Sequence, residues 1–188
     1  MAHELSKFVT SYVKMPENSL HLFTELWAQK KRFAKNEMIV CQGDRCVDLY
    51  FIETGLTRFY FATPDGKEHS KAFHSDGQLV GSLSALLQGT PSQFSISAES
   101  DCRCLVTRYS DLSALAESDL SVSQFLRLYY QELFMRKEQR EMELMTLSAV
   151  ERYQQFKKAN HKWEHLIPQY HIASYLGVTP ETLSRIRA

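Results

Sequence analysis

Short runs of apolar residues, separated by polar turn residues, predict β-strands along the middle of the chain. These runs are rich in β-branched and aromatic residues, and they span residues 38–41, 48–53, 56–62, 68–73, 94–98 and 102–107. Glycines recur at positions 43, 55, 66, 77 and 89, and Pro64-Asp65-Gly66 is a clear turn signal. Such even spacing is typical of an antiparallel sandwich or jelly roll.

Helical periodicity flanks this region on both sides. Residues 4–13 and 19–27 predict two short helices interrupted at Pro16, the first with an apolar stripe. Residues 112–147 also have a helical pattern, and Ser118-Asp119 predicts a cap for a long helix that begins at Leu120. A further helix is expected over residues 149–159.

The long helix carries apolar residues at the spacing of a coiled-coil seam. Val122, Leu126, Tyr129 and Leu133 follow one another in steps of 4, 3 and 4 residues. A helix of about 25 residues extends roughly 38 Å, which exceeds the size of a small jelly roll. A seam this short could also pack on the β-strands, but we expect it to pair two copies of the chain.

Residues 169–187 predict two short helices joined by a tight turn. Ile172, Ala173 and Leu176 form a buried helix face, and Gly177 supplies the positive φ that ends the first helix. Thr179 is suited to cap the second helix.

The second helix completes the pattern of a helix-turn-helix. Pro180 stands at a first helical position, Leu183 and Ile186 point back to the first helix, and the small Ala173 lets the two helices cross closely. The second helix of such a motif can enter the major groove of DNA. An ordinary helical hairpin that closes a small core is the alternative.

Several polar side chains of the second helix are suited to DNA. Glu181 can accept a hydrogen bond from cytosine N4, and Arg185 can pair with guanine O6 and N7. Hydroxyl groups can donate to phosphates, and they are carried by Thr179, Thr182 and Ser184. Arg187 completes the predicted DNA-binding set.

The charge of the chain is unevenly distributed. Its 188 residues have a formal net charge of zero, yet the part from Glu151 onward holds six basic and three acidic residues. A basic terminal segment on a slightly acidic body fits local attraction to phosphates. The chain has no apolar run long enough to span a membrane and no signal-peptide layout at its start, so we expect a cytoplasmic protein without a membrane partner.

The sequence predicts no metal, no cofactor and no catalytic residue. Four cysteines occur without a secretory signal, which argues against a disulfide framework, and their spacing is not that of a zinc or iron–sulfur site; they are Cys41, Cys46, Cys102 and Cys104. A jelly-roll metalloenzyme needs converging histidines. His69 and His74 would face opposite sides of one strand unless a bulge intervened, so we expect a protein that is not an enzyme.

Three stretches of the chain resemble the CRP/FNR (catabolite activator) family of bacterial transcription regulators, most closely its Bacteroidetes-type members. They are Gln42-Gly-Asp44 with the Asp48-Leu-Tyr-Phe-Ile-Glu-Thr-Gly55 that follows, the segment 77–83, and the segment 172–186. The resemblance covers nearly the whole chain. It implies an α+β fold with a cyclic-nucleotide-binding-like β-roll over residues 1–117, a dimerisation helix over 118–147 and a helix-turn-helix domain over 148–188.

The effector site implied by the resemblance lacks its usual charges. The family's cyclic-nucleotide binders use a Glu for the ribose and an Arg for the cyclic phosphate, but Ser82 and the run Ser92-Gln93-Phe94 stand at those positions. Cyclic AMP and cyclic GMP are therefore not expected as ligands. The pocket would instead take a less charged molecule, or be filled by its own side chains, and its expected walls are Leu79, Gly81, Ser82, Leu83, Ser92, Gln93 and Phe94.

The resemblance implies a DNA-binding transcriptional regulator. The expected partners are double-stranded DNA with a pseudo-palindromic operator, a second copy of the chain, a small-molecule effector and RNA polymerase. Two features favour the alternative of a dimeric ligand-binding or interaction module without DNA binding. Pro180 stands where the family often has an Arg, and no residues follow Ala188 to form a β-hairpin wing. The cysteine cluster of the family's iron–sulfur sensors is missing, since no Cys precedes Cys41.

Overall fold

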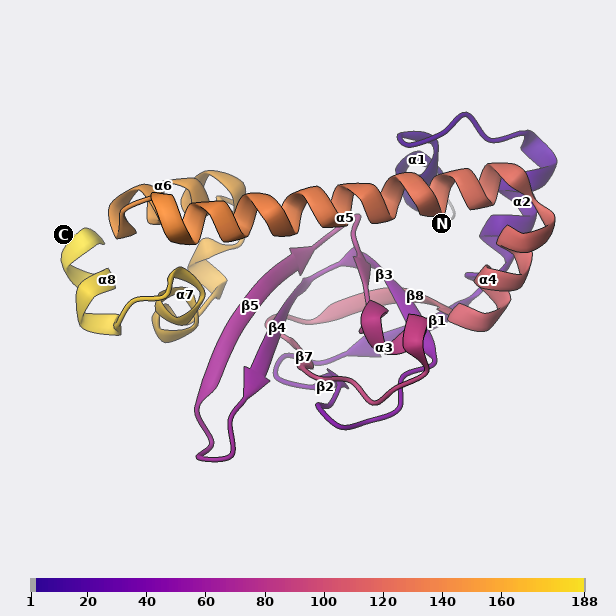
Figure 1. The fold of residues 1–188 in the computed structure, drawn as a ribbon. Helices are drawn as coiled ribbons and strands as arrows, with labels where there is room; N and C mark the ends of the chain where they lie inside the picture. Colours follow the sequence, from indigo (N-terminus) through magenta and orange to yellow (C-terminus); the bar gives the residue numbers. More distant parts are fainter. Residues whose placement is uncertain (1–2, 188) are drawn as a thin grey trace.

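The computed structural model describes residues 3–187, which form a β-roll, a long helix and a C-terminal group of short helices (Figure 1). The long helix, α5 (Leu120–Thr146), runs along one side of the β-roll and ends beside the C-terminal helices. Within the described residues, no helix combines the length and the apolar character needed to cross a membrane.

The β-roll consists of two four-stranded antiparallel sheets, which confirms the predicted jelly-roll class. The first sheet has the order β1 (Gln29–Phe33), β8 (Cys102–Arg108), β3 (Asp48–Thr54), β6 (Leu79–Val80). The second has the order β2 (Met38–Val40), β7 (Ser95–Ala98), β4 (Leu56–Ala62), β5 (Glu68–Ser75). Tyr50 and Ile52 of the first sheet pack with Phe59 and Ile96 of the second, so the strands bury one face of each sheet against the other.

Strands β1 and β6 and the short helix α3 (Leu83–Gln88) were not expected from the sequence. The sequence of β1 is Gln-Lys-Lys-Arg-Phe, and only its Phe33 is buried. This strand lies at the edge of its sheet, where lysines and arginines reach solvent and discourage pairing with other chains. Its charged residues hide the apolar alternation by which strands are recognised.

Four helices cover the outer face of the first sheet. They are α1 (His3–Thr10), α2 (Glu17–Glu25), α4 (Tyr109–Ser118) and the first half of α5. Phe51 of β3 is fully buried beneath Phe23, Trp27 and Phe125. The predicted cap of α5 is confirmed, because the Asp119 side chain accepts hydrogen bonds from the backbone N–H groups of the first turn.

The C-terminal helices form a second, smaller core. They are α6 (Ala149–Ala159), the 3₁₀ turn η1 (Glu164–Leu166), α7 (Gln169–Leu176) and α8 (Pro180–Arg187). Ser148 and Glu151 form a capping box that begins α6 directly after α5 ends. Leu56 of β4 belongs to the same apolar cluster as Ile172 and Leu183, so this core reaches onto the β-roll.

Candidate nucleic-acid interface

The helix-turn-helix has the local geometry that its sequence predicts. Gly177 ends α7 in the left-handed conformation with φ 71°. The hydroxyl of Thr179 accepts from the backbone N–H of Thr182 at 3.2 Å, which is the cap of α8. Ala173 and Leu183 are fully buried between the two helices. The motif is therefore rigidly built, and its outward face is set by α8.

The outward face of α8 presents three of the predicted DNA-binding side chains to solvent. Glu181, Ser184 and Arg185 are exposed, and a hydrogen bond from the Thr179 hydroxyl is the main cause that lowers the pKa of Glu181. A carboxylate acceptor and a guanidinium donor, four residues apart on one helix, match the edges of cytosine and guanine.

The remaining predicted contacts are partly engaged within the chain. The Thr179 and Thr182 hydroxyls lie 3.2 Å apart and stabilise the start of α8. The Arg187 guanidinium lies 3.6 Å from the Glu164 carboxylate, and it also lies over the ring of Tyr153. Arg187 therefore helps to hold α8 to the rest of its domain.

The basic residues of α6 divide into structural and exposed ones. Arg152 donates to the carbonyl groups of Leu147 and Leu176, at 2.5 and 3.1 Å, and so ties the end of α7 to the end of α5. Lys157 and Lys158 are exposed in the last turn of α6. These two lysines are available to phosphates, in keeping with the positive charge of the terminal segment.

The structure brings together Ser82 and Ser92, which the resemblance places where cyclic-nucleotide binders carry their charges. Ser92 Oγ donates to Ser82 Oγ at 2.8 Å or to the carbonyl of Phe94 at 2.7 Å, and both serines are buried. The ring of Phe94 packs against Phe59, and the Lys71 ammonium lies 3.9 Å from its centroid. A pair of neutral hydroxyl groups therefore occupies the place of the family's Glu and Arg.

The other expected effector residues are dispersed. Leu79 is buried in the core under the N-terminal helices, Gly81 and Leu83 are half-buried, and Gln93 is exposed. An enclosing effector pocket around this set stays a prediction.

A cavity of about 220 Å³ lies close by, between α1, the turn before β6 and α5. Leu79 lines it together with Tyr12, His74, Gln78 and Arg136. Burial lowers the pKa of His74 to about 4, and the positive charges of Arg136 and Lys71 add to this effect. The imidazole is therefore neutral at physiological pH in a cationic setting.

The seam expected on α5 packs on its own chain. Val122, Leu126 and Tyr129 are buried in the core formed with the first sheet and the N-terminal helices, and Leu133 packs against the same core. This corrects the expectation that Val122 and Tyr129 face a second copy, whereas Leu126 also lines the groove described next. The seam packs instead on the β-strands, which was the alternative considered from the sequence. This packing covers the apolar outer face of the first sheet.

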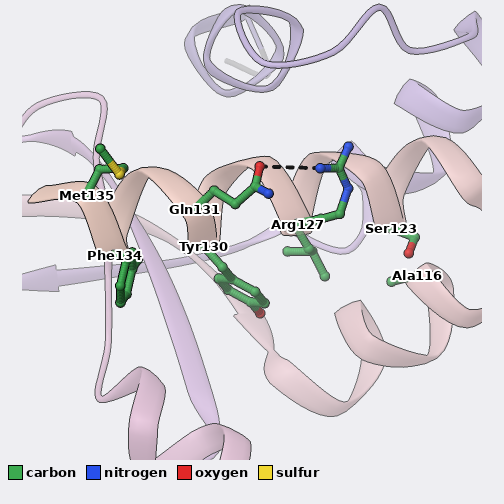
Figure 2. A pocket seen from close by; sticks show the side chains of 8 residues that line it. Ala116, Ser123, Arg127, Tyr130, Gln131, Phe134 and Met135 are labelled. Atoms are coloured by element: carbon green, nitrogen blue, oxygen red, sulfur yellow. Dashed lines mark hydrogen bonds between the residues drawn. The ribbon is translucent and has the colours of Figure 1, made fainter.

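Beside this buried stripe, α5 carries an open groove of about 840 Å³. Figure 2 shows its lining, which consists of Ala116 from α4 and side chains of α5, including Ser123, Arg127, Tyr130, Gln131, Phe134 and Met135. The residues Ser123, Arg127, Tyr130 and Phe134 have the spacing of the expected seam, shifted by one position. One position turns the direction of a helical side chain by about 100°.

The bulge that would allow His69 and His74 to converge is present in β5. The register shifts where Phe59 pairs with Ala72 and Tyr60 with Ser70, so Lys71 is the extra residue. Even so, His69 is exposed and His74 stacks on Phe59 at 4.5 Å. Among the described residues, no group of three or more His, Cys, Asp or Glu side chains could hold a metal ion.

Comparisons with known proteins agree with this geometry. The model of the cyclic nucleotide-binding domain matches residues 30–119. Regulatory protein HlyX of Actinobacillus pleuropneumoniae is 27% identical over 187 residues, which cover 92% of this chain and 75% of that protein. The fumarate and nitrate reduction regulatory protein of Vibrio cholerae is 26% identical, and the alignment covers 90% of this chain and 72% of that protein.

The fold is also similar to that of solved structures. FixK2 from Bradyrhizobium japonicum superposes with a TM-score of 0.73 at 24% sequence identity, over 85% of this chain and 82% of that protein. A cyclic nucleotide-binding domain, a long helix and a helix-turn-helix thus follow one another as they do in these relatives. The chain is similar in sequence to regulators of the CRP/FNR type, and its fold is similar to that of FixK2.

Proposed function

We propose that the protein is a homodimeric transcriptional regulator that reads a pseudo-palindromic DNA site with α8. The observation that carries this proposal is the rigid helix-turn-helix, whose outer face leaves Glu181, Ser184 and Arg185 exposed while its inner face is fully packed. In this proposal residues 1–117 are the sensor, residues 118–147 the dimerisation helix and residues 148–188 the DNA-binding domain. RNA polymerase and a small-molecule effector are further proposed partners.

The experiment that tests the proposal is selection of bound fragments from bacterial genomic DNA with the purified protein. Enrichment of a palindrome with half-sites about 34 Å apart is the expected result, because a two-fold dimer presents its recognition helices to successive major grooves. Failure to enrich any such site would overturn DNA reading and leave an interaction module.

Arg185 is expected to contribute to sequence-specific binding. Arg185→Ala should weaken binding to the selected site by about 1–3 kcal/mol, because a bidentate contact to a guanine is lost. Lys157→Ala is the matched control, since loss of a phosphate contact should mainly flatten the dependence of affinity on salt. Fluorescence anisotropy at several salt concentrations measures both effects. Equal affinity of Arg185→Ala and the unaltered protein would contradict the assignment.

We place the dimer contact of this proposal on the groove of α5. Phe134 and Met135 are 59% and 60% exposed, and Met142 and Met145 continue the apolar surface along the helix. Exposed large apolar side chains beside a groove are typical of an interface. The groove borders the core of its own chain and is open to solvent, so a second α5 can reach it.

Phe134→Glu is expected to dissociate the dimer. Placing a charge in the centre of a desolvated contact should weaken association by about 2 kcal/mol or more, which is roughly 30-fold in the dissociation constant. Sedimentation velocity over a range of concentrations measures the shift. Leu87→Glu is the control, because Leu87 is 56% exposed on α3, outside the groove. An unchanged sedimentation profile for Phe134→Glu would place the dimer contact elsewhere.

A further inference from the structure

Helix α7 docks on the β4–β5 hairpin of its own β-roll through polar groups. Ser174 Oγ accepts from the backbone N–H of Ser70 at 2.9 Å and donates to the carbonyl of Glu68 at 3.2 Å. These contacts bring a helix and a strand together across more than 100 residues of sequence. The supporting helix of the helix-turn-helix is thus fixed to the sensor sheet directly.

Beside this contact lies a buried ionic network centred on Arg58 of β4. Arg58 is 2% exposed, and its guanidinium donates to Ser70 Oγ at 2.9 Å and to the Glu68 carboxylate at 2.6 Å. Its Nη1 lies 2.5 Å from Nε2 of His171, which belongs to α7. Arg58 therefore connects both strands of the hairpin to the DNA-binding domain.

The network continues from His171 to a buried carboxylate, whereas the Glu68 carboxylate at its other end is exposed. His171 Nδ1 lies 3.3 Å from Glu99, which is 4% exposed and also accepts from the Ser97 hydroxyl at 3.4 Å. An arginine can only donate, so the facing Nε2 accepts and the ring proton lies on Nδ1, from which it is donated to Glu99. Undocking α7 would remove the His171 hydrogen bond from Glu99.

We propose that this network, made of Arg58, Glu68, Glu99 and His171, is a releasable latch that holds the helix-turn-helix in the orientation used to read DNA. Paired buried charges add little net stability, because their desolvation offsets most of their attraction, yet they specify one geometry. The latch therefore defines where α7 sits without locking it permanently.

The exposure of α8 indicates that the docked state is the one able to read DNA. Docking uses α7, while Glu181, Ser184 and Arg185 stay exposed on α8. A latch that covered these residues would inhibit DNA binding. This latch leaves them exposed and fixes the position of α8. Fixing both recognition helices of a dimer before binding removes an ordering cost, which raises affinity for a correctly spaced site.

Strand β4 links the latch to the sensor interior. Arg58 faces α7, whereas the next residue, Phe59, faces the interior and packs on Phe94 and His74. Neighbouring residues of a strand move together, so a molecule that shifted Phe59 or Phe94 would also shift Arg58. The latch in this way gives a direct route from the β-roll to α7, independent of the dimer helix.

Hydrogen exchange on the full-length protein tests the latch, with the Ser70 amide as its reporter because that amide donates to Ser174. Arg58→Gln should accelerate exchange of peptides covering residues 68–70 and α7 by about tenfold, since charged hydrogen bonds that hold the docked state are lost. Peptides of β3 and β8 should be unchanged. Lys31→Gln is the control, because it removes the Lys31–Asp48 pair at 3.0 Å, far from α7.

A second variant keeps the test decisive if Arg58→Gln does not fold. Ser174→Ala removes both hydrogen bonds of a half-buried side chain and favours the helix, so it should fold and still accelerate exchange at Ser70. Arg58→Lys should restore only part of the protection, because an ammonium cannot reproduce the three-way contact of the guanidinium. Unchanged exchange of the α7 peptides in Arg58→Gln, or in Ser174→Ala alone where that variant is the one that folds, would overturn the latch.

The role of the latch in DNA reading rests on the proposed function and has its own measurement. Arg58→Gln should bind the selected operator about tenfold more weakly, because the recognition helices are no longer held in position. Faster exchange with undiminished affinity would reject this role. The exchange experiment needs no DNA, so it decides the latch even if no operator is found.

Discussion

A Gly55→Ala substitution is expected to lower the free energy of unfolding by about 3 kcal/mol or more, since it combines backbone strain with overpacking. Gly55 joins β3 to β4 with φ 120°, a conformation that residues with a side chain rarely adopt. An added Cβ would lie 2.6 Å from Cys102 Sγ and 2.7 Å from the carbonyl of Asp101. Part of this obstruction is backbone, which cannot rotate away.

Gly66→Ala separates the two causes. Gly66 also has a positive φ, of 82°, but an added Cβ there would meet nothing within 4 Å. It should therefore show only the conformational penalty, about 1 kcal/mol. Urea denaturation at one fixed protein concentration measures both variants. Equal destabilisation by the two substitutions would show that the contact with Cys102 and Asp101 has no effect.

Phe125→Ala is expected to destabilise the protein by about 3–5 kcal/mol, since a buried aromatic ring is removed and a cavity remains. Phe125 is fully buried, and its ring lies 5.4 to 5.9 Å from the rings of Phe8, Tyr12 and Phe23. It is therefore the point at which α5 contacts both N-terminal helices. Because its loss loosens α5 from the sheet, we expect a lower unfolding midpoint in the same urea series.

Leu120→Ala provides the comparison for Phe125→Ala. Leu120 lies on the same helix but is 84% exposed, so its truncation should change stability by about 0.5 kcal/mol or less. A similar loss for both variants would mean that burial in the N-terminal core does not determine the stability of α5.

The elements that follow local rules were predictable from the sequence. The cap at Asp119, the positive φ at Gly177 and the end of α7 each depend on a few neighbouring residues, and the structure confirms all three. Strand β4 was also predicted with its observed bounds, because apolar residues fill almost every position. Local propensity and burial agree at these sites, so a short window of sequence contains the answer.

The assignment of the α5 faces could not be obtained in the same way. Two stripes with the same spacing lie side by side on this helix, and only the presence of the sheet decides which of them is buried. Periodicity gives the spacing of an interface but not its partner. The outer stripe contains Ser123, Arg127 and Gln131, which made it look less apolar than the stripe that packs internally.

The latch was also missed, because its members are distant in the sequence. Arg58 and His171 are 113 residues apart and meet only when α7 folds back on β4. One signal was present in the sequence. Arg58 interrupts an otherwise apolar strand, and a charge in such a position requires a partner in the fold. His171 likewise stands directly before the buried pair Ile172 and Ala173.

Helix α5 is buried in the core of the protein only along its first half. Its buried residues are Val122, Phe125, Leu126 and Tyr129, all in the first half, whereas most side chains from Phe134 onward are exposed. The first half cannot rotate about its own axis without bringing polar residues into the core, so the helix is restricted to bending or tilting. While α7 stays docked, Arg140 and Arg152 also hold the far end of α5 to α7. Once α7 is released, displacement grows with distance from the buried half of α5 and is greatest at Thr146, where the DNA-binding domain is attached.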